Sequence, residues 1–436
     1  MNGSYRGFGA VMAAFFWTVS TGPAALGAPA DGPCPETAAC IGDKITAQNL
    51  DDMLGRNFQG HKLSDVMIER VVWQIREHNL EVTLGKSHPF EIDPHYAALN
   101  ERNRTAVTYE AKTRRPVGWI GGVPFPDIDP ADPHVGWKVA WNQAYGRSHG
   151  DSLHRRRFVW ILIDGQQGVE RVQHWNFRRI WMAGRYGASS DHHLLGDGTI
   201  LYKEIFSAMA PQDLKGVGTF NIRYNTGAYD DTWAYIRDLR RVRRLSGGNW
   251  MDPLGSTDYL NDDFDVLGAF PTWYEDFRLI GRQMLVIDAK STGHVHWEEN
   301  AQSLDETFPT LELGKAPYWH PKKEWELRET FVVEAIPPAD HPYSRKIAYI
   351  NPDIWNASHG ETYDKSGEFH KWLYQPAERY TPEDNPDGHA YWAAMGAAID
   401  YQTNHGTIYA GLIEMIFNGP LTSEDISLGV LEAEGQ

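Results

Sequence analysis

The chain has 436 residues, of which 58 are Asp or Glu and 41 are Lys or Arg, so its formal net charge is −17. This charge argues against a general nucleic-acid-binding protein, because such proteins need a basic face. The length allows one large domain or two smaller ones with an ample core, and after the first thirty residues no apolar run predicts a membrane-spanning helix.

The first thirty residues have the pattern of a secretory signal peptide. Arg6 is their only charged residue, residues 11–19 are apolar, and small residues dominate 22–30. A positive start, a short apolar core and a small-residue end are typical of a cleaved signal, and a buried N-terminal helix is the alternative. We therefore predict export to the periplasm, a loose leader at 31–45 and one continuous domain at 46–436.

Two cysteines, Cys34 and Cys40, lie close together near the start of the mature chain. Residues 31–33 (DGP) before Cys34 do not match a lipid-anchor signal, so we expect a free protein that does not span the membrane. An exported location permits a disulfide that would close a small local loop, and two free thiols are the alternative. No zinc site is expected at the cysteines, because histidines are not nearby.

Helical signals come first along the chain. A helix is predicted to start near Thr46, and apolar residues recur at helical spacing through residues 64–77. Residues 84–135 are rich in Pro, Gly and Asp, which predicts long ordered loops. A short helix is predicted at 137–145.

From Arg156 onward the pattern predicts β structure. Apolar and aromatic runs alternate with Gly, Asp and Pro turns. Because no helix of ten or more residues separates these runs, neighbouring strands should pair antiparallel. Residues 277–285 predict two strands joined through Gly281-Arg282, and residues 390–401 predict a helix. The predicted strands are 158–163, 171–182, 199–207, 217–225, 232–237, 273–280, 282–289, 326–336, 344–351 and 406–417.

Aromatic residues are dense in the β region. Rings at this density fill a core or line an apolar cavity. Both interpretations stay open for each residue, and we favour a curved sheet with an open apolar interior. The candidates for a ligand cavity are Trp160, Trp175, Phe177, Trp181, Tyr224, Trp233, Tyr235, Trp273 and Phe277.

Four motifs resemble one Gram-negative family. Its members are described as outer-membrane lipoprotein-sorting-type proteins of unknown function, similar in fold to LolA and LolB. The motif at 229–244 is the most specific of the four. The motifs are GGVPFP at 121–126, followed by GWKVAWN at 136–142; YDDTWAYIRDLRRVRR at 229–244; WYEDFRLIG at 273–281; and VVEA at 332–335, followed by YSRKIAYI at 343–350.

The resemblance implies a mainly β fold, in which a curved, half-open antiparallel β barrel has helices inside or across its mouth. In the LolA-like fold that hollow binds lipid acyl chains. The family also implies that the protein works beside an inner-membrane exporter of the resistance-nodulation-division class. It brings no catalytic residues and no cofactor.

Arginines cluster at the end of the most specific motif, at Arg240, Arg241, Arg243 and Arg244. They are candidates for docking to an acidic partner or an anionic lipid headgroup. The alternative is pairing with nearby acids, which are Asp230, Asp231, Asp262, Asp263 and Asp265.

Two patterns resemble chemical sites without matching one fully. Gly146-Arg147-Ser148-His149-Gly150 has the spacing of a nucleophile elbow, but it lies after a predicted helix and before a strand, which reverses the required context. We therefore interpret it as a glycine-rich turn.

His294, His296 and Glu298 would share one face of a strand and could hold zinc or copper, and Asp191, His192 and His193 form a second cluster. Solvated polar residues are the alternative for both, and we predict no metal and no cofactor.

The sequence thus favours a binding protein that carries a lipid or another hydrophobic molecule across the periplasm, rather than an enzyme. The first alternative is a periplasmic enzyme, such as a metal-assisted hydrolase, acting on a hydrophobic substrate. The second is a scaffold subunit of an envelope complex with no ligand of its own.

Overall fold

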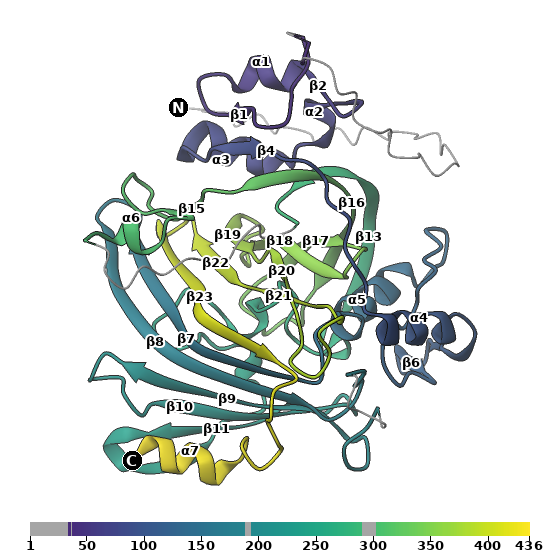
Figure 1. Cartoon of the computed structure of the whole chain (residues 1–436), viewed down its shortest axis with the longest axis vertical. Coiled ribbons are helices and arrows are strands. Elements are labelled where there is room, and N and C mark those ends of the chain that lie inside the picture. The colour runs from purple at the N-terminus through teal and green to yellow at the C-terminus, as the bar shows by residue number, and fades with distance from the viewer. Residues whose placement is uncertain (1–33, 36, 188–192, 290–301) are drawn as a thin grey trace, which may run out of the picture.

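The computed structural model describes residues 34–35, 37–187, 193–289 and 302–436 (Figure 1). The predicted signal peptide and residues 31–33 and 36 of the leader lie outside this part. None of the helices in the described part is long and apolar enough to cross a membrane.

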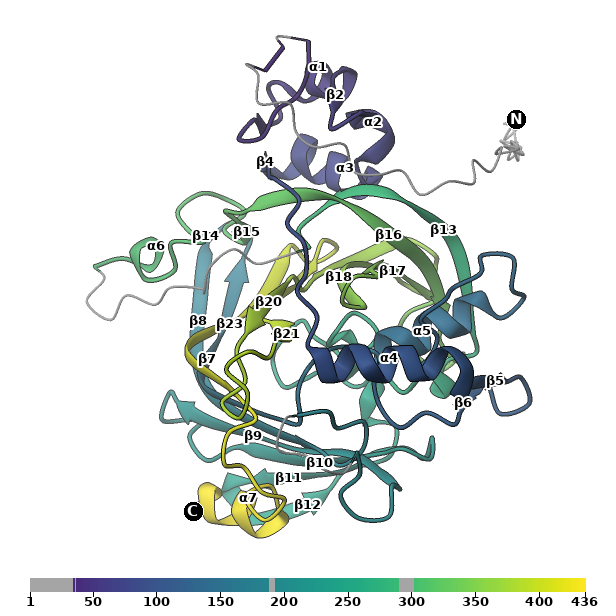
Figure 2. The same ribbon diagram turned by 45° about the vertical axis from the view of Figure 1, so that its right-hand side comes forward.

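One large sheet of 15 strands curves around a hollow (Figures 1 and 2). In spatial order its strands are β1 (Lys44–Ile45), β4 (Val82–Leu84), β16 (Glu324–Ile336), β17 (Arg345–Asn351), β18 (Asn356–Tyr363), β19 (Phe369–Tyr374), β22 (Met395–Asp400), β23 (His405–Phe417), β7 (Ser152–Asp164), β8 (Gly168–Trp181), β9 (Ile200–Ala210), β10 (Gly218–Tyr224), β11 (Asp231–Ile236) and β12 (Arg241–Arg244), and β13 (Asp276–Ile287) pairs with β16.

Strand pairing confirms the predicted fold class. Neighbouring strands of the large sheet pair antiparallel, apart from a parallel contact in which Glu324 and Trp325 of β16 pair with β4. In the described residues β12 and β13 do not pair with each other, so the sheet stays half open. The strands predicted from 158–163, 171–182, 199–207, 217–225, 232–237, 326–336, 344–351 and 406–417 are all present as β7, β8, β9, β10, β11, β16, β17 and β23.

Strand β7 shows why this sheet forms from a continuous apolar run. Val159, Ile161 and Ile163 point to one face and join one buried cluster, while Phe158 and Trp160 point to the other face and join a second cluster. A strand buried on both faces needs apolar residues at every position. The hollow side of the sheet and its outer side therefore each carry a core.

The N-terminal segment packs on the outer side of the sheet (Figure 1). Its helices are α1 (Leu50–Gly55), α2 (Leu63–Val66) and α3 (Glu69–His78), with the short hairpin β2 (Asn57–Phe58) and β3 (His61–Lys62). The predicted helix at 64–77 is interrupted after α2, because Met67 and Ile68 have extended backbone. A disulfide joins Cys34 to Cys40 at the start of this segment.

The rest of the outer side is covered by later segments. Residues 302–323 contribute Phe308, Leu311 and Trp319 to the same outer core. They form α6 (Leu304–Thr307) and the hairpin β14 (Leu311–Glu312) and β15 (His320–Pro321). Helix α7 (Leu428–Gly435) packs below β9, β10 and β11 (Figures 1 and 2).

Two kinds of segment fill the hollow. Helix α5 (Val135–Tyr145) buries Trp137, Val139 and Trp141 in the inner core, and it confirms the helix predicted at 137–145. The connection from β12 to β13 also enters the hollow, through the short helical turns η2 (Asn249–Met251), η3 (Asn261–Asp263) and η4 (Pro271–Trp273). We call residues 249–273 the inner segment.

The prediction of loops at 84–135 was wrong in part. Helix α4 (Pro94–Ala106) lies across the opening of the hollow (Figure 2), and the hairpin β5 (Thr108–Glu110) and β6 (Arg115–Val117) follows it. Asp93 caps α4 by accepting hydrogen bonds from the backbone of His95 and Tyr96, and Pro94 is the first helical residue. This start signal is readable in the sequence.

The prediction of two strands joined through Gly281-Arg282 was also wrong. One continuous strand, β13, runs through these residues and pairs with β16 along its whole length. Its register shifts between Leu279 and Gly281, which leaves Ile280 as the extra residue of a β-bulge, 58% exposed. A glycine within an alternating run marks a bulge as readily as a turn.

The helix predicted at 390–401 is instead strand β21 (Ala390–Ala393), which pairs with β20 (Ala377–Tyr380), followed by β22. Small residues suit this place because the inner segment and neighbouring rings come close to the sheet. A Cβ at Gly396 would lie 2.5 Å from the ring of Tyr409. Tertiary packing therefore overrides the helical preference of alanine.

Candidate functional site

A cavity of about 290 Å³ lies inside the curved sheet, between β7–β11, β23 and the inner segment. Its mouth is beside Leu245 and Asp252, which are both exposed. Alternate residues of each strand point inward, so that Phe177 and Arg179 of β8 face the cavity while the intervening Arg178 does not. This alternation builds a wall with two chemically different parts.

The first part of the wall is aromatic. Most of its rings are buried, and they pack edge to face, for example Trp160 against Tyr409 with centroids 5.6 Å apart. The rings that line the cavity are Phe158, Trp160, Phe177, Tyr202, Phe206, Trp250, Phe264, Trp392 and Tyr409.

The second part of the wall is a ladder of charged and amide side chains on β8, β9 and β10 and at the start of β11. Arg179 Nε donates to Glu204 Oε2 at 2.8 Å, and Arg223 Nε donates to Asp230 Oδ1 at 2.6 Å. Asn221 Nδ2 links the two pairs by lying 3.2 Å from Glu204 Oε1 and 3.1 Å from Asp230 Oδ2. Burial alone would lower the pKa of Arg223, but the carboxylate of Asp230 keeps this pKa above its usual value.

A smaller cavity of about 40 Å³ adjoins the first and shares Arg179, Tyr202 and Arg223 with it. The imidazole of His149 stacks on Trp181 there, with ring centroids 3.8 Å apart. Burial lowers the pKa of His149 to about 3, so this ring is neutral at ordinary pH.

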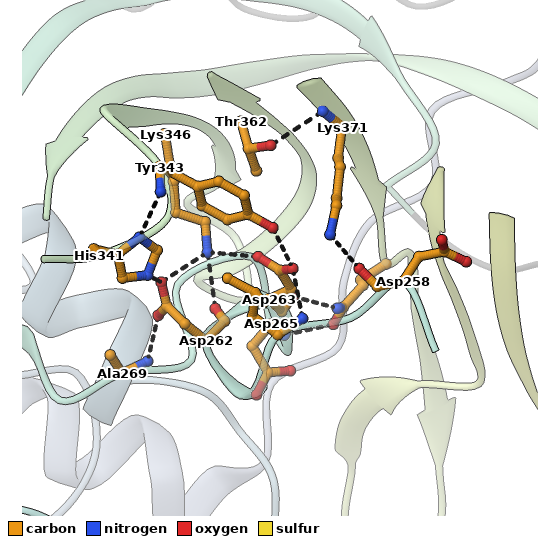
Figure 3. Close-up of polar contacts among 12 residues, drawn as sticks. Asp258, Asp262, Asp263, Asp265, Ala269, His341, Tyr343, Lys346, Thr362 and Lys371 are labelled. Carbon is orange, nitrogen blue, oxygen red and sulfur yellow. Dashed lines mark hydrogen bonds and ion pairs between the residues drawn. The ribbon is translucent and has the colours of Figure 1, made fainter. Parts of the chain in front are cut away.

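The inner segment is tied to β17 and to the residues just before it by a buried polar cluster (Figure 3). Lys346 Nζ of β17 lies 3.0 Å from Asp262 Oδ2 and 3.1 Å from Asp263 Oδ1, and His341 Nε2 lies 3.3 Å from Asp262 Oδ2. Tyr343 donates to Asp263 at 2.8 Å. Burial alone would raise the pKa of Asp262, but Lys346 and His341 lower it below its usual value.

These polar contacts hold the inner segment rather than form an open site. The side chains of Asp262, Asp263, His341 and Lys346 have no exposed surface. None of the four lines either of the two cavities. We therefore assign the cluster a structural role.

Further contacts hold the same segment on either side of this cluster, at Asp258 and Asp265. His405 Nδ1 lies 2.8 Å from Asp258 Oδ2, and Lys371 Nζ donates to the carbonyl of Asp258 at 2.5 Å. Arg147, which follows α5, pairs with Asp265 at 2.6 Å. The inner segment thus forms one fixed side of the cavity.

The structure places three of the nine candidate aromatics in the walls of the two cavities and the other six elsewhere. Trp160 and Phe177 line the main cavity, and Trp181 lines the smaller one. The other six do not line either cavity. Trp175, Trp273 and Phe277 belong to or pack against the inner core, Tyr224 is half-buried and donates to Asp231, and Trp233 and Tyr235 pack on the outer side with α7.

The predicted docking arginines lie on β12, the last strand of the sheet, and on Arg240 just before it. All four are exposed. Arg244 pairs with Asp231, whereas no carboxylate of the described residues lies within ion-pair distance of Arg240, Arg241 or Arg243. Of the acids expected as local partners, Asp230 pairs with Arg223, Asp265 with Arg147, and Asp262 and Asp263 with Lys346.

Residues 146–150, which have the spacing of a nucleophile elbow, connect a helix to a strand, as the sequence predicted. Helix α5 ends at Tyr145 and β7 begins at Ser152. Ser148 is fully buried, and its hydroxyl contacts Tyr186 Oη at 3.0 Å and donates to the carbonyl of His389 at 3.1 Å.

Most of the candidate metal ligands cannot be placed. His294, His296, Glu298, Asp191 and His192 lie outside the described residues. His193 contacts the carbonyl of Arg185 at 2.7 Å. Over the described ranges, three or more His, Cys, Asp or Glu side chains do not come together in a way that could hold a metal ion.

Sequence reasoning missed the charged wall. A signal for it exists in β10, where Thr219, Asn221 and Arg223 alternate with the apolar Phe220 and Ile222. Alternation alone would place them toward solvent. Only the curvature of the sheet reveals that this polar face looks into a hollow.

Comparisons with known proteins place the chain among uncharacterised relatives. A family model described as protein of unknown function (DUF1329) matches residues 44–414. The uncharacterised protein PA3922 of Pseudomonas aeruginosa is 26% identical over 177 residues, which cover 38% of this chain and 35% of that protein. The match therefore spans about a third of the length of this curated relative.

Two solved structures are similar at low sequence identity. A proposed outer membrane lipoprotein-sorting protein domain from Vibrio parahaemolyticus is 19% identical with a TM-score of 0.45, over 68% of this chain and 98% of that chain. A LolA superfamily protein from Nitrosomonas europaea is 12% identical with a TM-score of 0.37, over 67% of this chain and 96% of that chain. The match of the family model agrees with the family resemblance of the four motifs.

Proposed function

The chain belongs to the DUF1329 family, and from this premise we propose that it is a carrier that shields a hydrophobic molecule inside its curved sheet. The observation that carries the proposal is the cavity of about 290 Å³ with its aromatic part. Ligand sites in proteins are concave and largely apolar, with a few polar groups that orient the ligand. The cavity combines an aromatic part of this kind with a charged part that is richer in polar groups.

The wall explains how such a molecule would be held. Its apolar part would lie against Phe158, Trp160, Phe177 and Phe206, and each methylene group removed from water would contribute roughly 0.8 kcal/mol. The paired charges of β8–β11 would face any polar part of the ligand. These groups already pair with one another within the wall, so they do not need a ligand to complete their hydrogen bonds.

The fixed inner segment supports a carrier rather than a scaffold without a ligand. The buried cluster around Lys346 fixes this segment to β17, and a cavity remains between the segment and strands β9 and β10. A scaffold protein has no need of such a hollow.

We propose further that the carrier works in the periplasm and delivers its ligand to, or receives it from, an inner-membrane exporter of the resistance-nodulation-division class. The signal-like residues 1–30 support the location. The exposed arginines Arg240, Arg241 and Arg243 on the free edge of the sheet support contact with an acidic surface. Release would require a partner that binds the ligand-free form better or offers the ligand a better site.

Native mass spectrometry of the mature protein purified from the periplasm tests the carrier function, with organic extraction of the same sample. We expect a discrete additional mass that extracts as a lipid-like compound. A protein that carries no such compound after purification without detergent, and that binds no hydrophobic probe when one is added, would contradict the proposal. Metal analysis of that sample would then test the enzyme alternative.

A further inference from the structure

Arg155 is a buried cation in the wall of the main cavity. It lies on β7, and only 5% of its surface is exposed. Its guanidinium donates to the carbonyl oxygens of Ala393 and Ala394, and Nη2 lies 3.3 Å from Met415 Sδ. These neighbours are neutral, so they leave the positive charge uncompensated.

The other arginines beside the cavity each have a carboxylate of their own, whereas none of the described carboxylates lies within ion-pair distance of Arg155. Asp265 acts on Arg155 only from a distance and is already paired. The remaining acid of the wall, Asp252, is exposed at the mouth. The complete pairs are Arg179 with Glu204, Arg223 with Asp230, and Arg147 with Asp265.

A buried charge without an opposite charge is costly, and a bound anion would remove that cost. We infer that the ligand is a hydrophobic molecule with one anionic oxygen group, a carboxylate or a phosphate, which binds the guanidinium of Arg155. This inference rests on the proposed carrier function, because it specifies the ligand of the same cavity. The planar guanidinium can meet two oxygens of such a group at once.

The aromatic rings around Arg155 indicate where the apolar part of this ligand would lie. Phe158 and Tyr409 flank the guanidinium, with ring centroids 5.6 and 5.3 Å from its carbon. Trp160 and Phe177 extend the apolar surface from there. A ligand whose anionic group lies at Arg155 can therefore lay its hydrocarbon part along the aromatic wall.

Four ligands with the same twelve-carbon chain test the inference. Dodecanoate, dodecyl phosphate, neutral dodecanol and cationic dodecyltrimethylammonium are titrated below their micelle concentrations into the full mature protein. The tryptophans in the wall, including Trp160 and Trp250, report binding through their fluorescence. The variants are Arg155→Met, Arg155→Lys and, as a control, Arg178→Met, which removes the same charge from a residue of β8 that does not line the cavity.

In the unmodified protein we expect an anionic ligand to bind at least about 10-fold more tightly than dodecanol, since a hydrogen bond to a charged group contributes at least 1.5 kcal/mol. Arg155→Met should reduce this preference to about 2-fold or less, while dodecanol binding stays unchanged. Arg178→Met should keep the preference. Whether dodecanoate or dodecyl phosphate binds more tightly identifies the anionic group.

Equal binding of dodecanol and both anions by the unmodified protein would overturn the inference while leaving the carrier function intact. Failure of all four ligands to bind would contradict the carrier function itself. If Arg155→Met does not fold, Arg155→Lys decides: it keeps the charge but loses the planar pair of donors, so weaker binding of the anions with unchanged dodecanol binding would support Arg155 as their site, and unchanged binding of all four ligands would overturn it.

Discussion

Lys346 and Asp262 form an ion pair of 3.0 Å in which both side chains are completely buried. A second carboxylate, Asp263, lies 3.1 Å from the same ammonium group. The pair joins the inner segment to β17, two parts of the chain more than eighty residues apart (Figure 3). The contact helps to fix the inner segment, which forms one side of the cavity.

The first prediction concerns this contact. Lys346→Met would leave two buried carboxylates without their ammonium partner, and we expect it to lower the free energy of unfolding by about 3–5 kcal/mol. Urea denaturation measures the change. Lys365→Met, which removes an exposed lysine from a nearby turn, should cost far less. Adding Asp262→Asn to Lys346→Met should recover part of the loss, and a double variant as unstable as the sum of both changes would contradict the pairing.

Because of His405, the folded protein should lose stability as the pH becomes alkaline. The hydrogen bond with Asp258 raises the pKa of His405 to about 9, against the opposing effect of burial. The unfolded chain has a lower histidine pKa, near 6.5. The folded state therefore binds the extra proton, so the stabilisation is complete below about pH 6.5 and disappears as the pH rises through 9.

Thermal unfolding of the unmodified protein and of His405→Gln between pH 6 and pH 10 measures this effect. The difference in Tm should be largest at pH 6 and should vanish near pH 10. Because other groups titrate equally in both proteins, their contributions cancel in the difference. A difference that does not change with pH would show that the ion pair with Asp258 contributes no net stability.

The mouth of the cavity offers a test that leaves the core intact. Leu245 lines the cavity and is 39% exposed, so Leu245→Trp should narrow the entrance without overpacking the interior. We expect weaker binding of a hydrophobic fluorescent probe, by about tenfold, with an unchanged Tm. Leu239→Trp adds the same ring to a surface leucine that is 46% exposed and lies away from the cavity, and it should bind the probe normally. Equal binding by both variants would place the ligand elsewhere.

Charge reversal at the free edge of the sheet tests partner docking. Arg241→Glu with Arg243→Glu should slow transfer of a bound fluorescent fatty acid to right-side-out inner-membrane vesicles, most strongly at low salt, because steering by exposed charges is screened by ions. Neither arginine has an ion pair among the described residues, so the fold should be unaffected. Normal transfer would refute docking at this edge.

Two comparisons complete this experiment. Lys62→Glu with Lys112→Glu makes the same change in net charge at exposed positions of β3 and of the turn between β5 and β6, and this variant should transfer the ligand normally. Protein-free vesicles of anionic lipid separate the two partners: a defect that persists there indicates contact with lipid headgroups, and a defect confined to inner-membrane vesicles indicates a membrane protein.

Local patterns in the sequence were enough to identify most strands and helix α5. The run Phe158–Ile163 could be recognised because a strand buried on both faces must be apolar throughout. The helical preference of the alanines at 390–401 pointed the wrong way, since close packing against Tyr409 selected small residues for a strand. At Gly281 a bulge and a hairpin turn share the same local signal, and only the long partner strand β16 distinguishes them.

The residues of the candidate site were harder to predict from the sequence than the strands were. Trp160 and Phe177 were identified as cavity candidates, but Trp233 and Tyr235 alternate along a strand in the same way and face α7 on the other side. Arg155 was not identified, because it is the first of three consecutive arginines and no local pattern marks it as the buried one.

The sequence by itself determined the mainly β, antiparallel character of the chain, its acidic surface and its family, because these depend on composition, short-range alternation and motifs. The tertiary structure alone decided that the sheet curves far enough to turn a polar face inward. It also decided that buried ion pairs hold the inner segment at one side of the hollow, where it leaves a cavity open. The physical reason is that both outcomes depend on contacts between residues far apart in the chain, such as Lys346 with Asp262, which no local pattern encodes.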